Sequence, residues 1–149
     1  MSTGAEPGER PASAFTPDEI EYLTAPHMGR LATIGKDGRP HITPVTYVFN
    51  VAEDAIDIGG IDFAHTKKWR DAQRNPKVTF LVDDASPDGA HAVEIRGDAE
   101  LHETGGSAIN PRFPNFVEQF IRLRPTHIVS WGLGSQFGTG EFKPYSRSV

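Results

Sequence analysis

The sequence has no cysteine among its 149 residues, which excludes disulfide bonds, thiol catalysis and cysteine-ligated metal sites. It also lacks any run of about 18 apolar residues, and its N-terminal part has no apolar core typical of a signal peptide. We therefore expect a cytoplasmic protein without a membrane span. The formal net charge of −5 disfavours nucleic acid or a membrane surface as partner, because binding to either needs a basic face.

Several catalytic and metal-binding signatures are also missing. There is no G-x-S-x-G nucleophile elbow and no G-x-G-x-x-G dinucleotide fingerprint. The histidines are scattered, and no two of them have the i, i+4 spacing of a metal-ligand pair on a helix. They are His27, His41, His65, His91, His102 and His127. The sequence predicts no metal site and identifies no catalytic residue.

Glycine and proline are frequent, at 15 and 12 residues, which is typical of a chain rich in turns. Residues 1–14 consist mainly of small and charged residues without an apolar period, which predicts a disordered arm. Residues 15–149 are enough for one hydrophobic core and predict a single domain.

Three helices are predicted between the strands. Thr16, Pro17 and Glu19 form a capping box at the start of the first, which stops before Pro26. The second covers residues 66–75. The third begins at Asn110-Pro111 and ends at Pro125, with one apolar face at helical spacing. That face consists of Phe113, Phe116, Val117, Phe120 and Ile121.

Six segments alternate with period two or are continuously apolar, and we expect them to be strands. They cover residues 29–34, 41–50, 55–60, 77–83, 91–102 and 127–132. Pro44 removes one ladder donor, which predicts an edge position or a bulge there, and residues 77–83 are expected to be buried on both faces. Because most connections are turns, we predict a mainly β fold with inserted helices, a closed or nearly closed six-stranded antiparallel barrel.

Residues 65–68, His-Thr-Lys-Lys, are the most informative stretch for function. Two lysines follow Thr66 at the start of a helix, where the macrodipole already supplies positive charge, so Lys67 and Lys68 favour a phosphate site. Two solvated surface lysines are the alternative. Gly59 and Gly60 could let a flat ring or pyrophosphate approach the backbone, or could form a simple turn. Trp131 is a candidate to cover an aromatic substrate, or else a residue of the barrel rim.

Three segments together resemble the pyridoxamine-phosphate-oxidase-like split β-barrels. Residues 29–45 are similar to the opening hairpin of that family, residues 66–78 to its lysine helix and the following strand, and residues 93–99 to the strand that closes the barrel. Within the family, residues 37–41, 68–71 and 127–132 resemble the branch that uses the deazaflavin coenzyme F420. The last of these is similar to a subgroup that includes reductases of tetracycline-type polyketide assembly.

The resemblance implies a homodimer with the cofactor bound between subunits, where the partner's last strand and tail complete the pocket. Lys68 would bind the cofactor phosphate with help from Thr66 and Lys67. The ring would lie along Pro44, Val45, Thr46, Tyr47, Ile58, Gly59 and Gly60. Asp71 stands where many relatives carry Asn, and Arg70 or Lys67 could offset its charge.

The implied reaction is hydride transfer from the reduced deazaflavin to an electron-poor carbon of a small organic substrate, such as the β-carbon of an enone. Lys36, Arg39 and Arg70 are candidates to contact the carboxylate-bearing tail of F420. FMN is the alternative cofactor, and a non-catalytic flavin, deazaflavin or haem binder is the alternative function. The aromatic tail residues are expected to pack on the second copy. They are Phe137, Phe142 and Tyr145.

Overall fold

The structure is a computed structural model that describes residues 12–134 and 143–149. Its helical elements are α1 (Pro17–Thr24), η1 (Phe63–His65), α2 (Lys67–Arg74) and η2 (Gly106–Ala108). Its strands are β1 (Gly29–Ile34), β2 (Pro40–Asn50), β3 (Ala55–Gly59), β4 (Lys77–Ser86), β5 (Gly89–His102), β6 (Phe120–Trp131) and β7 (Tyr145–Ser148). No helix in the described part is long and apolar enough to cross a membrane.

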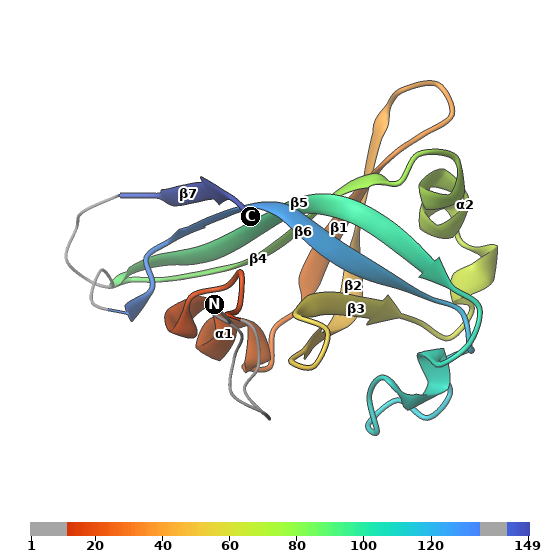
Figure 1. The fold of residues 1–149 in the computed structure, drawn as a ribbon, viewed down its shortest axis with the longest axis horizontal. Coiled ribbons are helices and arrows are strands. Elements are labelled where there is room, and N and C mark those ends of the chain that lie inside the picture. Colours follow the sequence, from red (N-terminus) through yellow and green to blue (C-terminus); the bar gives the residue numbers. More distant parts are fainter. Residues whose placement is uncertain (1–11, 135–142) are drawn as a thin grey trace, which may run out of the picture.

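The strands form one antiparallel sheet that closes on itself. Their order is β3-β2-β1-β4-β5-β6-β7, and an additional pairing of β3 with β6 closes the first six into a barrel (Figure 1). A closed barrel has no unpaired edge along the closing strands, and it encloses one side-chain core. The predicted six-stranded antiparallel barrel with inserted helices is therefore confirmed.

The third predicted helix, over residues 110–124, is wrong. Residues 111–119 form turns, and β6 begins at Phe120 and runs through Pro125. Pro114 is the physical reason, because at the fourth helical position it has no N–H for the Asn110 carbonyl and its ring collides with that carbonyl. The apolar spacing of this segment reflects the separate burial of Phe116 and of the start of β6.

Pro125 lies inside a strand where the ladder is irregular. It pairs with Gly97 of β5, next to a register shift between Arg96 and Gly97. A Cβ on Gly97 would lie 2.0 Å from the carbonyl oxygen of Arg124, so this close approach requires glycine. The free side of β6 also changes partner here, from β3 over residues 121–123 to β7 over residues 127–130.

The structure tests two further expectations about strands. Strand β2 lies between β3 and β1, so the expectation that the strand with Pro44 is an edge strand is wrong. Pro44 is tolerated because it pairs only with Arg30 of β1, whereas the pairing of β2 with β3 begins at Thr46. The expectation that residues 77–83 are buried on both faces is wrong. Only Val78, Phe80 and Val82 are buried, whereas the alternate positions are partly or fully exposed, because one face of β4 points away from the core.

Helix α1 lies against one side of the barrel sheet (Figure 1) and begins with the predicted capping box. The Thr16 hydroxyl accepts from the Glu19 backbone N–H at 3.1 Å, and the Glu19 carboxylate accepts from the Thr16 N–H at 2.9 Å. Leu23 enters the core. Glu19 is fully buried as well, and it forms an ion pair with Arg147 of β7 at 2.6 Å.

The predicted arm and tail are described only in part. Residues 1–11, Phe137 and Phe142 lie outside the described residues. At the end of the predicted arm, the Ala14 N–H donates to the Asp54 carboxylate at 2.8 Å. Tyr145 is half-exposed in β7, and this strand pairs with β6 of the same chain.

Candidate cofactor and substrate site

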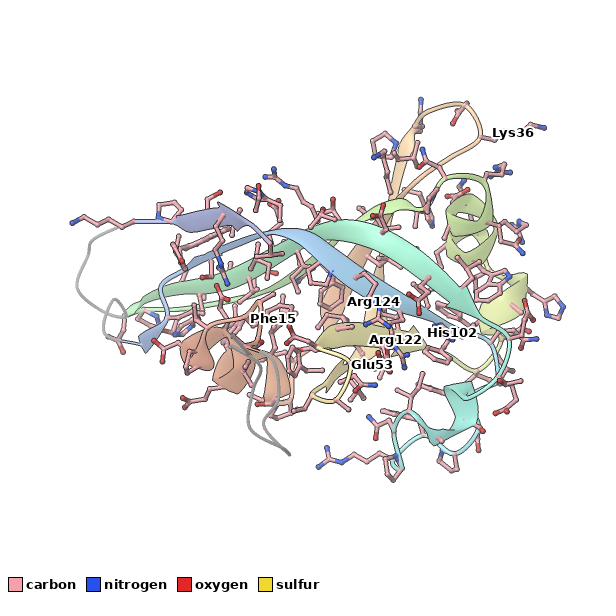
Figure 2. All side chains as sticks on the ribbon, in the orientation of Figure 1. Phe15, Lys36, Glu53, His102, Arg122 and Arg124 are labelled. Atoms are coloured by element: carbon pink, nitrogen blue, oxygen red, sulfur yellow. The ribbon has the colours of Figure 1, made fainter. Side chains whose placement is uncertain are left out.

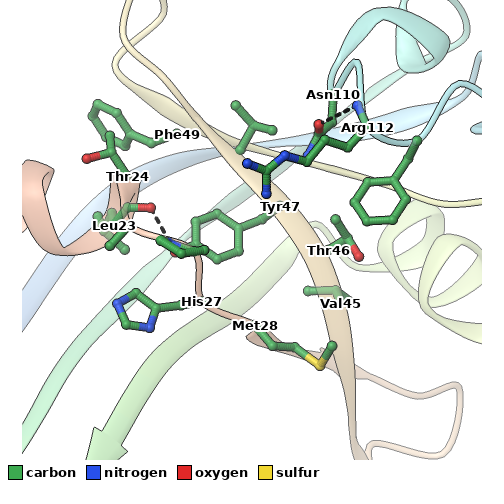
Figure 3. Close-up of a pocket in the computed structure, with 14 residues that line it drawn as sticks. Leu23, Thr24, His27, Met28, Val45, Thr46, Tyr47, Phe49, Asn110 and Arg112 are labelled. Carbon is green, nitrogen blue, oxygen red and sulfur yellow. Dashed lines mark hydrogen bonds between the residues drawn. The ribbon is translucent and has the colours of Figure 1, made fainter.

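A groove with a cavity volume of about 540 Å³ runs along β2. One wall is the segment that joins α1 to β1, and the other comes from the loop before β6. Figure 3 shows His27 on the left of β2 and Arg112 on its right. The lining consists of residues 23–28 and 45–49 together with Asn110, Arg112 and Phe113. Its volume is within the range typical of small-molecule sites.

Tyr47 fixes the floor of this groove to α1. Its buried hydroxyl donates to the backbone carbonyl of Leu23 at 2.8 Å, and its ring meets Phe80 edge to face at 5.0 Å. Burial raises the pKa of the Tyr47 hydroxyl, so the phenol stays protonated and keeps this hydrogen bond. Val45, Thr46 and Tyr47, three of the predicted ring-binding residues, all line the groove, and exposed Pro44 directly precedes them.

A second pocket, which we call the basic pocket, lies between the β1–β2 turn and the start of α2. Its volume is also about 540 Å³. It is lined by Lys36, Asp37, Arg39, Pro40, His41 and Lys67. Figure 2 shows Lys36 on the turn that projects beside α2. Three cations against one carboxylate make this pocket positive, although the whole chain is negative.

Asp71 is the buried counter-charge of this region. Its carboxylate accepts from Lys67 at 3.0 Å, from Arg74 at 2.8 Å and from the Thr33 hydroxyl at 2.9 Å. Burial opposes ionisation of Asp71, but these hydrogen bonds outweigh it and hold the pKa of the carboxyl below its usual range. Lys67 thus offsets the charge of Asp71 as expected, together with Arg74. Arg70 instead donates to the carbonyl of His65 at 2.9 Å.

Lys68 differs from Lys67 in having no anionic partner in the described part of the chain. Its ammonium lies 5.6 Å from the centre of the Phe63 ring, and partial burial lowers the pKa of its side chain. A half-buried cation without a carboxylate beside it favours an anionic ligand. The Thr66 hydroxyl is engaged in the helix cap, because it donates to the Phe63 carbonyl at 2.6 Å and accepts from the Trp69 N–H at 3.4 Å.

The other predicted site residues are covered or lie elsewhere in this chain. Ile58 is fully buried in the core. A Cβ on Gly59 would lie 3.1 Å from the Phe116 ring, and the Gly60 carbonyl accepts from the Val117 N–H at 3.0 Å. The loop before β6 thus covers both glycines. Trp131 pairs with Ala92 at the end of β6 and is not part of the groove lining.

Most of the groove residues were missed from the sequence, among them His27, Met28, Arg112 and Phe113. These four lie in connecting segments, where no hydrophobic period marks a face. For Arg112 and Phe113 the sequence did contain a signal, namely Pro114. A proline at this position breaks the predicted helix and indicates that residues 110–113 form a loop near the barrel.

The residues present fit a flat ring that carries a phosphorylated chain. The groove offers mostly apolar walls, and the basic pocket and Lys68 offer cations. Strand β2 connects the two pockets, because His41 lines the basic pocket and Val45 lines the groove. Four residues of strand at about 3.3 Å each separate them by about 13 Å. An antiparallel barrel with these two sites defines the class of split-barrel, flavin-type proteins.

The chain belongs to the pyridoxamine 5'-phosphate oxidase family, whose pattern it matches over residues 16–129. It is 39% identical over 129 residues to the 5a,11a-dehydrotetracycline/5a,11a-dehydrooxytetracycline reductase of Streptomyces rimosus. This alignment covers 85% of this chain and 89% of that protein.

Two solved structures share the fold. One is an F420 reductase with 22% identity and a TM-score of 0.57, which covers 76% of this chain and 98% of that chain. The other is an FAD-binding protein from Mycobacterium smegmatis with 21% identity and a TM-score of 0.59, which covers 80% of this chain and 96% of that chain.

Proposed function

We propose that this chain is an F420-dependent reductase that transfers a hydride to an electron-poor C=C bond of a tetracycline-type intermediate. The observation that carries this proposal is the 39% identity to a dehydrotetracycline reductase across most of both chains. The match is long enough to span the barrel, the groove and the basic pocket. The chain is accordingly an enzyme of the oxidoreductase class.

Residues of the groove, of the basic pocket and of the start of α2 would hold the cofactor. When bound, the reduced deazaflavin supplies the hydride. Lys68 would bind the phosphate with Thr66 and Lys67 beside it, and the ring would lie along Val45, Thr46 and Tyr47. The lack of an anionic partner for Lys68 in the described part supports this role.

F420 and FMN share a ring system and a phosphate, so Lys68 alone does not distinguish them. F420 adds a tail of carboxylates, and Lys36 and Arg39 lie together with Lys67 in a pocket suited to it. Arg70, the third predicted tail residue, does not line this pocket and donates to the His65 carbonyl. The clustering of cations in an acidic protein favours F420.

The decisive experiment titrates the purified protein with F420 and with FMN at low and high salt. We expect tighter binding of F420, with an affinity that falls more steeply with salt than that of FMN, because more charges are paired. Turnover is then measured with reduced F420 and 5a,11a-dehydrotetracycline. Tighter FMN binding at physiological salt, or equal salt dependence for both, would favour the FMN alternative.

Arg39→Ala tests the basic pocket directly. It should weaken F420 binding and flatten its salt dependence, and it should leave FMN binding nearly unchanged. Arg30→Ala is the matched control, because Arg30 pairs with Asp83 on another part of the barrel. An equal loss for both cofactors in Arg39→Ala would place the tail elsewhere.

A further inference from the structure

Reduction of a C=C bond needs a proton as well as a hydride. After hydride addition to the β-carbon of an enone, the substrate is an enolate, which must gain one proton to become the neutral product. This argument rests on the proposed function above. The described groove lining contains three side chains that carry an N–H or O–H and can be charged or titrated: His27, Tyr47 and Arg112.

Two of these three are unsuited to give up a proton. The Tyr47 hydroxyl is buried, donates to the Leu23 carbonyl, and has a raised pKa. Arg112 has a guanidinium that stays protonated in proteins, so it can stabilise a negative oxygen but cannot deliver a proton. His27 is the remaining group, and imidazole exchanges protons near neutral pH.

The surroundings of His27 orient its ring without using its nitrogens. The ring lies against Tyr22 with centroids 4.4 Å apart, and neither nitrogen has a hydrogen-bond partner among the residues that the structure describes. Figure 3 places His27 at the wall of the groove, beside Met28. A ring that is held by stacking but has both nitrogens available is suited to contact a ligand.

The carboxylate of Asp84 is hydrogen-bonded to Tyr22, the ring that packs against His27. The Tyr22 hydroxyl donates to Asp84, and His91 Nδ1 lies 3.2 Å from the other oxygen of the same carboxylate. The hydrogen bond from Tyr22 is the main reason that the pKa of Asp84 is lowered, and the hydrogen bond and charge of His91 lower it more than a charge on His27 does. Asp84 is thus ionised at neutral pH and favours a positive charge nearby.

We propose that His27 is the proton donor of the reaction, and that Tyr22 and Asp84 are its positioning residues. The bound reduced deazaflavin would supply the hydride to the β-carbon of the C=C bond, which leaves an enolate on the substrate. An N–H bond of protonated His27 breaks while an O–H bond forms at the enolate oxygen, which gives the enol. Neutral His27 then regains a proton from solvent, which also receives the proton that the cofactor loses on oxidation, so atoms and charge balance.

The test compares wild type with His27→Gln, which has no acidic proton near neutral pH. Assays use reduced F420 and 5a,11a-dehydrotetracycline, in H2O and in D2O. We expect kcat to fall by about 100-fold or more, within the range typical of general acid catalysis, while KM changes little. In D2O the wild-type kcat should fall, because an N–H bond of His27 breaks in the reaction, whereas the variant should lose most of this solvent isotope effect.

Three further measurements separate chemistry from folding. The thermal midpoint and the F420 affinity of His27→Gln should match those of wild type. Added imidazole should restore activity to His27→Ala, because it fills the vacated space. His102→Gln is the matched control, because His102 pairs with Glu100 and stacks on Phe120 outside the groove, and it should retain wild-type kcat.

The outcomes distinguish the two proposals. Wild-type kcat and a wild-type solvent isotope effect in His27→Gln would overturn the role of His27 and leave the proposed function intact. A wild-type protein that does not turn over with reduced F420 and the tetracycline substrate would overturn both. Tyr22→Phe removes the bond to Asp84 but keeps the ring contact, so it should reduce kcat less than His27→Gln does.

Discussion

Two adjacent lysines have different surroundings in this protein. Lys67 is paired with buried Asp71, whereas Lys68 lies over Phe63 without an anionic partner in the described part. We predict that Lys68→Ala weakens cofactor binding by about 1.5–3 kcal/mol, or roughly ten- to a hundred-fold, because one charge-assisted phosphate contact is lost. Stability should change little. Fluorescence titration with F420 and urea unfolding measure the two effects.

Lys77→Ala is the control for Lys68→Ala, because Lys77 is an exposed lysine at the start of β4 outside both sites. Lys67→Ala should instead lower stability, since it leaves Asp71 with fewer partners. Unchanged affinity in Lys68→Ala would show that the phosphate binds elsewhere.

At the residue scale, contacts between residues close in the sequence could be predicted, whereas contacts between distant segments could not. The capping box of Thr16 and Glu19 depends on residues three positions apart, so the sequence was sufficient. The ion pair of Glu19 with Arg147 joins distant segments, and His27 and Arg112 line one groove although they are far apart in the sequence. No spacing rule reports such contacts, because they depend on how the barrel closes.

At the scale of elements, periodicity identified the six barrel strands and two helices, but it failed for residues 110–124, which include the start of β6. The same apolar residues fit one face of a helix, and they also fit a buried loop followed by a strand. Pro114 and Pro125 resolve this ambiguity, since an interior proline lacks the helical donor. A proline can lie in a strand where the ladder is irregular, as Pro125 does opposite Gly97.

The contact between β7 and α1 yields a prediction about stability. Burial opposes ionisation of Glu19, but hydrogen bonds from Arg147 and Ser130 outweigh it and hold the pKa of Glu19 below its usual range. We predict that Arg147→Ala destabilises the protein by about 3–5 kcal/mol, because a buried carboxylate loses its partner. Urea unfolding at pH 7 measures this loss.

Two comparisons make the Arg147 experiment specific. The double variant Glu19→Gln with Arg147→Ala should recover part of the loss, since no buried charge remains. Arg30→Ala breaks an exposed pair with Asp83 and should cost no more than about 1 kcal/mol. Equal, small losses for Arg147→Ala and Arg30→Ala would contradict the importance of the buried pair.

At the scale of the whole molecule, we predict a two-fold dimer. Met28 and Phe113 at the groove are 60% and 41% exposed, and Ile42 on β2 is 60% exposed. Apolar side chains that water surrounds in one chain favour burial against a second copy. Light scattering at micromolar concentration should give about 33 kDa, twice the chain mass of 16.3 kDa.

A mass near that of one chain at this concentration would contradict the dimer and, with it, a cofactor site shared between subunits. Ile42→Lys offers a second measurement, because a charge at a buried interface position should shift the protein toward the monomer. Leu81 is a matched control position on the partly exposed face of β4, where Leu81→Lys should leave the mass unchanged if β4 lies outside the interface.

The ion pair between Glu19 and Arg147 also bears on the order in which the protein is synthesised and folds. The two residues are 128 positions apart, and every strand of the barrel lies between them. The ribosome makes α1 early, but the partner of its buried carboxylate appears only after β6 is complete. The barrel can therefore close before α1 is able to dock with its charge paired. We expect the α1 wall of the groove to form late, so a nascent chain acquires its barrel before its substrate site.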